Sequence, residues 1–116
     1  MGEEYTFQEL IDITKKVIEE FDKVEQRPWT VEVTMMELSK QVGDLAKHIM
    51  VFEKYYLKKR EEDPNYKTTK EDIGDELADI LYCLIRIAQH YKINLEETHL
   101  EARRNELKSL GKNPFF

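Results

Sequence analysis

The stretch "GDELADILYCLIRIAQHY", residues 74–91, decides the fold, because apolar side chains recur through it every three or four residues. That spacing places them on one side of a helix. The apolar face consists of Ile73, Leu77, Ile80, Leu84, Ala88 and Tyr91. Glu76 and Asp79 interrupt the pattern at the edge of this face, in a strip with Asp72 and Cys83. The segment is therefore predicted to be a helix that carries a row of carboxylates beside its apolar side.

Residues that commonly cap helices mark four helix starts along the chain. Thr6, Thr68 and Asn94 are each followed three residues later by a glutamate, which is the capping-box pattern. Thr30 is the expected cap of a second long helix, and Gly111 is a natural stop after the last one. The expected helices end at about Lys23, at Lys59 or Arg60, at about Tyr91 and just before Gly111. The predicted fold class is all-α, with four helices in one bundle.

The composition limits the classes of protein to consider. The 116 residues suffice for one core, so residues 1–116 are treated as a single domain. A formal net charge of −6 argues against a nucleic-acid polymer as partner. The opening "MGEEYTFQEL" lacks the apolar run of a signal peptide, and no apolar run is long enough to span a membrane. The single cysteine, Cys83, cannot form an internal disulfide. We therefore expect a cytoplasmic protein without a membrane partner.

A second polar row lies on the second expected helix, beside the apolar stripe formed by Leu38, Val42, Leu45 and Ile49. This row consists of Glu37, Gln41, Asp44 and His48. Side chains three and four apart on a helix can act on one object, and oxygen ligands suit Mg²⁺, with Mn²⁺ as the alternative. We expect the two rows to face each other and to hold one divalent cation. The expected metal ligands are Glu37, Gln41, Asp44, Glu76 and Asp79. The plainer alternative is that both rows are solvated helix faces.

The stretches "QVGDLAKHI" and "GDELADILYCLIRIAQHYKINLEE" resemble the MazG-type nucleotide pyrophosphohydrolases of the all-α NTP pyrophosphatase superfamily, over about residues 27–108. The family pattern is E-x-x-E on one helix and E-x-x-D on the next. Glu76 and Asp79 match the second half. Gln41 and Asp44 stand where the first half has its two glutamates.

The resemblance implies a MazG-like four-helix fold and a Mg²⁺-dependent hydrolase. Its reaction would convert a nucleoside or deoxynucleoside triphosphate into the monophosphate and pyrophosphate, as in house-cleaning of the nucleotide pool. Asp44, Glu76 and Asp79 would be its catalytic residues. The alternative, favoured by the altered first motif, is a catalytically silent MazG-like module that binds nucleotides or a protein partner.

Three further residues are candidates for substrate binding. Trp29 could stack on a base, although a lone tryptophan before a helix is more often a hydrophobic clasp. The resemblance implies phosphate contacts from the last helix, for which Asn105 and Lys108 are the candidates.

The apolar side chains outnumber those that one small core needs. The surplus is Met35, Met36, Met50, Phe52, Tyr55, Tyr56, Phe115 and Phe116. Together with the resemblance, this surplus predicts a homo-oligomer, either a homodimer or a homotetramer.

Overall fold

The structure, a computed structural model, describes residues 2 and 4–116. Its elements are α1 (Phe7–Asp22), α2 (Val31–Phe52), α3 (Lys58–Glu61), the 3-10 turn η1 (Pro64–Tyr66), α4 (Lys70–His90) and α5 (Leu95–Ser109). No strand occurs within the described residues, so the predicted all-α class is confirmed. The described residues form five α-helices rather than the four predicted, because a single-turn helix, α3, lies between the second and third of the expected ones.

Most of the predicted helix starts and stops are found in the structure. The Thr6 hydroxyl accepts a hydrogen bond from the Glu9 amide at 3.1 Å, and the Glu9 carboxylate accepts one from the Thr6 amide at 3.0 Å. Thr30 caps α2 and Asn94 caps α5 through their side-chain oxygens. Gly111 follows α5 with φ of 74°, the left-handed conformation that glycine adopts at least cost.

The predicted cap of α4 was wrong by one residue. Thr69, rather than Thr68, caps the helix, and its capping-box partner is Asp72 rather than Glu71. The sequence offers two adjacent threonines, each followed three residues later by an acid, so the local pattern does not choose between them. The Thr68 hydroxyl lies 2.9 Å from Nδ1 of His48 on α2, and this contact leaves Thr69 to cap the helix.

The predicted end of the second helix at Lys59 or Arg60 was also wrong, because α2 ends at Phe52. Lys54 takes a left-handed φ of 60°, and the Tyr55 amide donates to the Met50 carbonyl at 2.9 Å, which closes the helix end. Tyr55, Tyr56 and Leu57 continue the apolar sequence past this point, so the pattern by itself gives no sign of the break.

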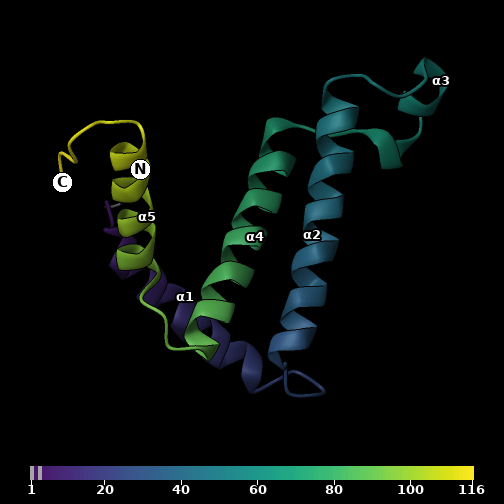
Figure 1. Cartoon of the computed structure of the whole chain (residues 1–116). Coiled ribbons are helices and arrows are strands. Elements are labelled where there is room, and N and C mark those ends of the chain that lie inside the picture. Colours follow the sequence, from purple (N-terminus) through teal and green to yellow (C-terminus); the bar gives the residue numbers. More distant parts are fainter. Residues whose placement is uncertain (1, 3) are drawn as a thin grey trace.

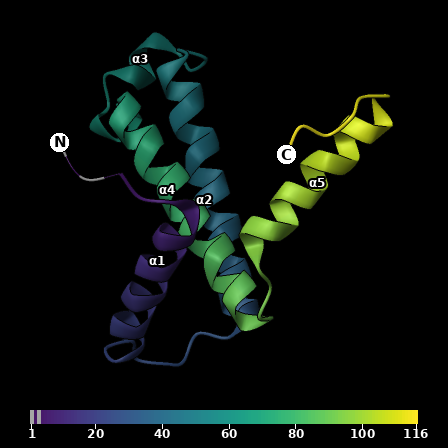
Figure 2. The same cartoon turned by 90° about the vertical axis from the view of Figure 1, so that its left-hand side faces the viewer.

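The long helices pack as an antiparallel pair with one crossing helix. α2 and α4 lie side by side and run in opposite directions, and α1 packs across α4 (Figure 1). α5 leaves the end of α4 and projects away from the pair as an arm, as Figure 2 shows from the side. No helix in the described part of the chain combines the length and hydrophobicity needed to cross a membrane.

The chain is open for its size. Its radius of gyration is 17.9 Å, whereas a compact domain of this length has about 13 Å. The hydrophobic side chains that are buried are Ile11, Ile18, Val51, Cys83, Ile85 and Ala88. They lie mainly where α1 meets α4, so the core of the single chain is small.

Candidate functional site

The polar rows predicted on the second and third helices come together where α2 lies against α4. Glu76 is a well-enclosed carboxylate of these rows, with 15% of its side chain exposed. Its Oε2 atom is buried and has no hydrogen-bond partner within the described part of the chain. Burial raises the pKa of Glu76, and the charges of Asp44 and Asp79 raise it further. The structure therefore brings these three predicted carboxylates close enough for their charges to interact.

Two carboxylates of α2 are paired to a lysine. Nζ of Lys40 lies 3.5 Å from Oε1 of Glu37 and 3.5 Å from Oδ2 of Asp44. The charge of Glu37, followed by that of Asp44, raises the pKa of Lys40. The Gln41 amide donates a hydrogen bond of 3.5 Å to the same Glu37 oxygen. Gln41 thus lies with Glu37, Asp44, Glu76 and Asp79 in one group, the carboxylate cluster, as its place in the polar row of α2 predicted.

His48 is a member of this cluster whose role the sequence did not reveal. Its Nε2 lies 3.7 Å from Oε1 of Glu76, and its Nδ1 lies 2.9 Å from the Thr68 hydroxyl. A histidine one helical turn after Asp44 is a local signal for the first contact. The contact with Thr68 depends on the path of the loop before α4, which the sequence pattern does not specify.

The oxygen-rich set fits a hard divalent cation in its chemistry, and the unpartnered Oε2 of Glu76 is an acceptor that such a cation would satisfy. Within the described residues, however, no group of three or more His, Cys, Asp or Glu side chains is arranged so as to hold a metal ion. Glu37 and Asp44 instead turn toward Lys40.

An aromatic pocket of about 280 Å³ opens beside the carboxylates. It is lined by Phe21, Glu25, Trp29, Glu37, Gln41, Asp79, Tyr82 and Cys83. The structure therefore places the predicted base-stacking residue, Trp29, in one pocket with three predicted metal ligands. Phe21 and Tyr82, which no sequence pattern singles out as site residues, also line the pocket, and their rings meet edge to face with centroids 6.2 Å apart.

Arg86 holds one wall of this pocket in place. It is 8% exposed and donates hydrogen bonds to Tyr82 at 3.1 Å, to Asp22 at 3.0 Å and to Glu25 at 3.3 Å. Its guanidinium carbon lies 5.1 Å from the centre of the Trp29 ring. Burial lowers the pKa of Arg86, but its bonded partners outweigh this effect and the pKa is raised. These contacts join α1, the α1–α2 loop and α4.

The predicted phosphate-binding residues lie elsewhere. Asn105 and Lys108 are exposed on α5, the arm that projects away from the α2–α4 pair (Figure 2). Asn105 faces a shallow hollow lined only by α5 residues. Within one chain, the structure does not bring these two side chains to the carboxylate cluster.

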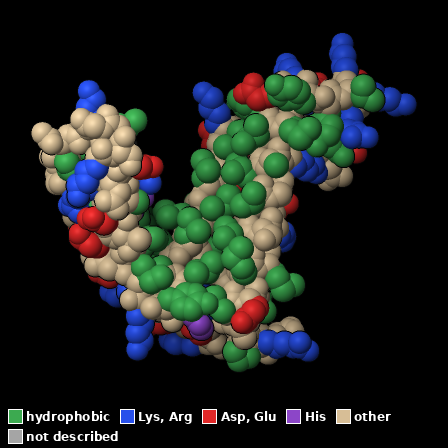
Figure 3. All heavy atoms as spheres, in the orientation of Figure 1, with side chains coloured by type: hydrophobic (Ala, Val, Ile, Leu, Met, Phe, Trp, Pro, Cys, Tyr) green, Lys and Arg blue, Asp and Glu red, His purple; other side chains and the backbone are tan. Residues whose placement is uncertain are grey.

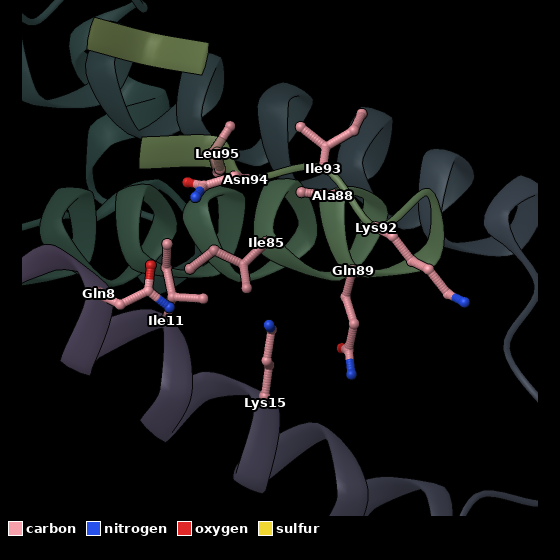
Figure 4. Close-up of a pocket in the computed structure, with 10 residues that line it drawn as sticks. All are labelled: Gln8, Ile11, Lys15, Ile85, Ala88, Gln89, Lys92, Ile93, Asn94 and Leu95. Carbon is pink, nitrogen blue, oxygen red and sulfur yellow. The ribbon is translucent and has the colours of Figure 1, made fainter. Parts of the chain in front are cut away.

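A second hollow of about 530 Å³ lies between α1 and the end of α4 (Figure 4). It is lined by Gln8, Ile11, Lys15, Ile85, Ala88, Gln89, Lys92, Ile93, Asn94 and Leu95. No carboxylate lines it, and it shares no residue with the aromatic pocket. It reflects the incomplete packing of α1 on α4.

No protein-family model matches the chain, and neither a curated protein nor a solved structure matches it. What the site can do is therefore argued from its own residues and contacts.

Proposed function

We propose that the chain is a Mg²⁺-dependent nucleoside triphosphate pyrophosphohydrolase with a MazG-like fold. The observation that carries this proposal is Glu76, a half-buried carboxylate with a buried, unpartnered oxygen and two acidic neighbours. A protein gains no stability from such an arrangement, because each added negative charge makes the buried one more costly. A bound divalent cation offsets this cost.

The residues that would hold the metal are Asp44, Glu76 and Asp79, with Gln41 or Glu37 as an additional oxygen ligand. Mg²⁺ would screen the phosphate charge and lower the pKa of an attacking water. Mn²⁺ is the alternative ion for the same oxygen ligands.

The aromatic pocket supports a nucleotide as the substrate. Trp29 and Tyr82 offer ring surfaces to a base, and Gln41 and Glu25 offer polar groups to its edge. Because Asp79 lines the same pocket, a base held there would have its phosphates beside the carboxylates. A volume of about 280 Å³ is sufficient for the base while the phosphates remain in the open part of the site.

The chain's own groups supply the remaining chemistry. A carboxylate that is not fully engaged with the metal would orient the attacking water and accept its proton. Attack on the α-phosphorus breaks its bond to the bridging oxygen and gives a nucleoside monophosphate and pyrophosphate. Asp44 and Asp79 are the more accessible candidates for this base, since Glu76 is enclosed.

Two features favour a second function, a catalytically silent module that binds nucleotides or a protein partner. Gln41 contributes no charge, and Lys40 already pairs with the carboxylates of Glu37 and Asp44. Both features weaken the attraction for a metal while leaving the aromatic pocket unchanged.

The test is pyrophosphate release from a panel of ordinary and modified nucleoside and deoxynucleoside triphosphates, with Mg²⁺ and with EDTA. Asp44→Asn and Asp79→Asn should each lower the rate by about 100-fold or more, the range for loss of a group that acts on the reacting water. Asp75→Asn is the matched control, because Asp75 is an exposed acid on the same helix outside the cluster.

Gln41→Glu adds the charge that the first motif lacks and should increase Mg²⁺ affinity. No release from any triphosphate by the folded parent chain or by Gln41→Glu would reject the enzyme. Nucleotide binding without release would then identify the silent module.

A further inference from the structure

The hollow between α1 and the end of α4 combines an apolar floor with positive charge (Figure 4). Ile11, Ile85 and Ala88 line it although each is at most 7% exposed, so its floor is formed by core side chains. Two lysines, Lys15 and Lys92, also line it. Its volume of about 530 Å³ lies within the usual range for small-molecule sites, roughly 300–1,000 Å³. The hollow is therefore large enough to hold a small organic molecule.

The positive charge of the hollow contrasts with the charge of the chain, which has 24 acidic and 18 basic side chains. The face of α1 that lines the hollow is the row Gln8, Ile11 and Lys15, spaced three and four residues apart, and no acidic side chain of α1 lines it. On the surface over α2 and α4 that Figure 3 shows, hydrophobic side chains gather with charged side chains mainly at the margins. The hollow differs from that surface because lysines border its apolar floor directly.

Within the described part of the chain, neither Lys15 nor Lys92 forms a salt bridge with a carboxylate. Lys15 is half-buried, and its side chain points from α1 toward Ile85 on α4 (Figure 4). Gln89 points from α4 into the same space between the two helices (Figure 4). A positive charge that is partly removed from water is less costly when an anion lies beside it. The hollow thus presents a cation and an amide to whatever occupies it.

We propose that this hollow is a binding site for a small organic anion, a molecule that carries a carboxylate or phosphate group on an apolar body. Lys15 would hold the anionic group, and the amide of Gln89 would donate a hydrogen bond to it. Lys92, exposed at the margin, would add to the attraction. The apolar body would lie against Ile85 and Ala88. The hollow shares no residue with the aromatic pocket, so this proposal does not depend on the proposed enzymatic function.

The test is the binding of hexanoate, hexyl phosphate and the neutral hexanamide to the full chain, measured by titration calorimetry in EDTA. Hexanoate and hexanamide have nearly the same shape, so their difference isolates the charge, and the two anions compare a carboxylate with a phosphate. EDTA removes divalent cations through which the carboxylate cluster could attract a phosphate. At least one anion should bind with a dissociation constant about tenfold or more below that of hexanamide, the effect of a hydrogen bond to a charged group. Equal binding of all three probes, or no binding of either anion up to about 10 mM, would overturn the proposal.

The variants test the residues that would hold the anion. Lys15→Gln should raise the dissociation constant of the anion by about tenfold or more. Gln89→Glu places a negative charge in the hollow and should weaken binding by a similar factor. Lys16→Gln is the matched control, because Lys16 is the next residue on α1, carries the same charge, is exposed and does not line the hollow. If both hollow variants bind the anion as tightly as the control does, the proposal is wrong.

Nuclear magnetic resonance locates the anion in the parent chain without any substitution. Titration with the anion that binds should shift the amide signals of Lys15, Gln89 and Ile93, which line the hollow. The indole signal of Trp29 in the aromatic pocket and the amide signal of Leu84 in the groove between α4 and α5 should stay in place. Shifts confined to Trp29 or Leu84 would place the anion in a different pocket and overturn the proposal.

Discussion

Nε2 of His48 lies 3.7 Å from Oε1 of Glu76, across the contact between α2 and α4. His48 favours the ionised form of this carboxylate, yet the pKa of Glu76 is raised, because burial outweighs the histidine and Asp44 adds to the effect of burial. The folded chain therefore binds a proton at Glu76 more tightly than the unfolded chain does.

The difference in proton binding between the folded and unfolded chain determines how stability depends on pH when no metal is bound. A carboxyl group whose pKa rises on folding is destabilising when it is charged, so the free energy of unfolding falls as pH rises through the folded pKa. Glu76→Gln removes the charge and keeps the shape. The variant should be more stable than the parent at pH 8 by on the order of 1 kcal/mol, the difference between burying a charged and a neutral polar group. The difference should vanish below pH 4, where both side chains are neutral.

Urea unfolding in EDTA from pH 4 to pH 8 measures the difference in free energy of unfolding between Glu76→Gln and the parent. Asp75→Asn serves as the control, since Asp75 is exposed and its neutralisation should shift stability little at any pH. A parent that is more stable than Glu76→Gln at pH 8 would show that the buried charge is satisfied within the chain.

Bound Mg²⁺ should offset the destabilisation caused by the ionised Glu76 carboxylate. A ligand that binds only the folded chain stabilises it by about 2.7 kcal/mol at one hundred times its dissociation constant. We therefore expect Mg²⁺ to raise the Tm of the parent and of Asp75→Asn, but not that of Glu76→Gln or Asp79→Asn. A thermal melt with MgCl₂ or with EDTA measures the shift. Equal shifts in all four proteins would place the metal elsewhere.

Arg86 should be the most stability-sensitive charged residue, because it joins α1 and the α1–α2 loop to α4. Arg86→Met keeps much of the apolar length but leaves Glu25, 14% exposed, without its cation. We expect a loss of roughly 3 kcal/mol in the free energy of unfolding, the lower end of the range for a broken buried pair. Arg103→Met is the comparison, since Arg103 pairs with Glu106 on the exposed side of α5 and should cost less than about 0.5 kcal/mol. Equal losses in urea unfolding would contradict this role.

Local patterns predicted the helices well, because capping and periodicity depend on neighbours in sequence. Thr6, Thr30 and Asn94 cap helices as expected. The pattern failed between Thr68 and Thr69, where a contact with His48, twenty residues away, separates two equal local choices. It failed again after Phe52, where the left-handed Lys54 closes the helix although apolar residues continue.

The candidate site was likewise predictable where it depends on spacing within one helix, and not where it depends on contacts between distant segments. The rows that contain Asp44 and Glu76 follow from helical spacing, and the structure places them together. The walls supplied by Phe21 and Tyr82, and the Arg86 contact to Asp22, join segments more than sixty residues apart. No periodicity in one helix specifies such pairs, so only the folded arrangement reveals them.

Cys83 offers a test of how closed the aromatic pocket is. Its side chain lines that pocket but is only 1% exposed, and burial raises the pKa of the thiol above its ordinary value of 9.0. The thiolate is the reactive form, so an alkylating reagent at pH 8 should modify the native chain roughly 100-fold more slowly than the chain unfolded in urea. The acidic neighbours Glu37 and Asp79 act in the same direction as burial, which further disfavours the thiolate. Mass spectrometry of the alkylated chain over time measures both rates. Similar rates in the native and unfolded chain would mean that the pocket opens freely and that Cys83 is not part of a fixed wall.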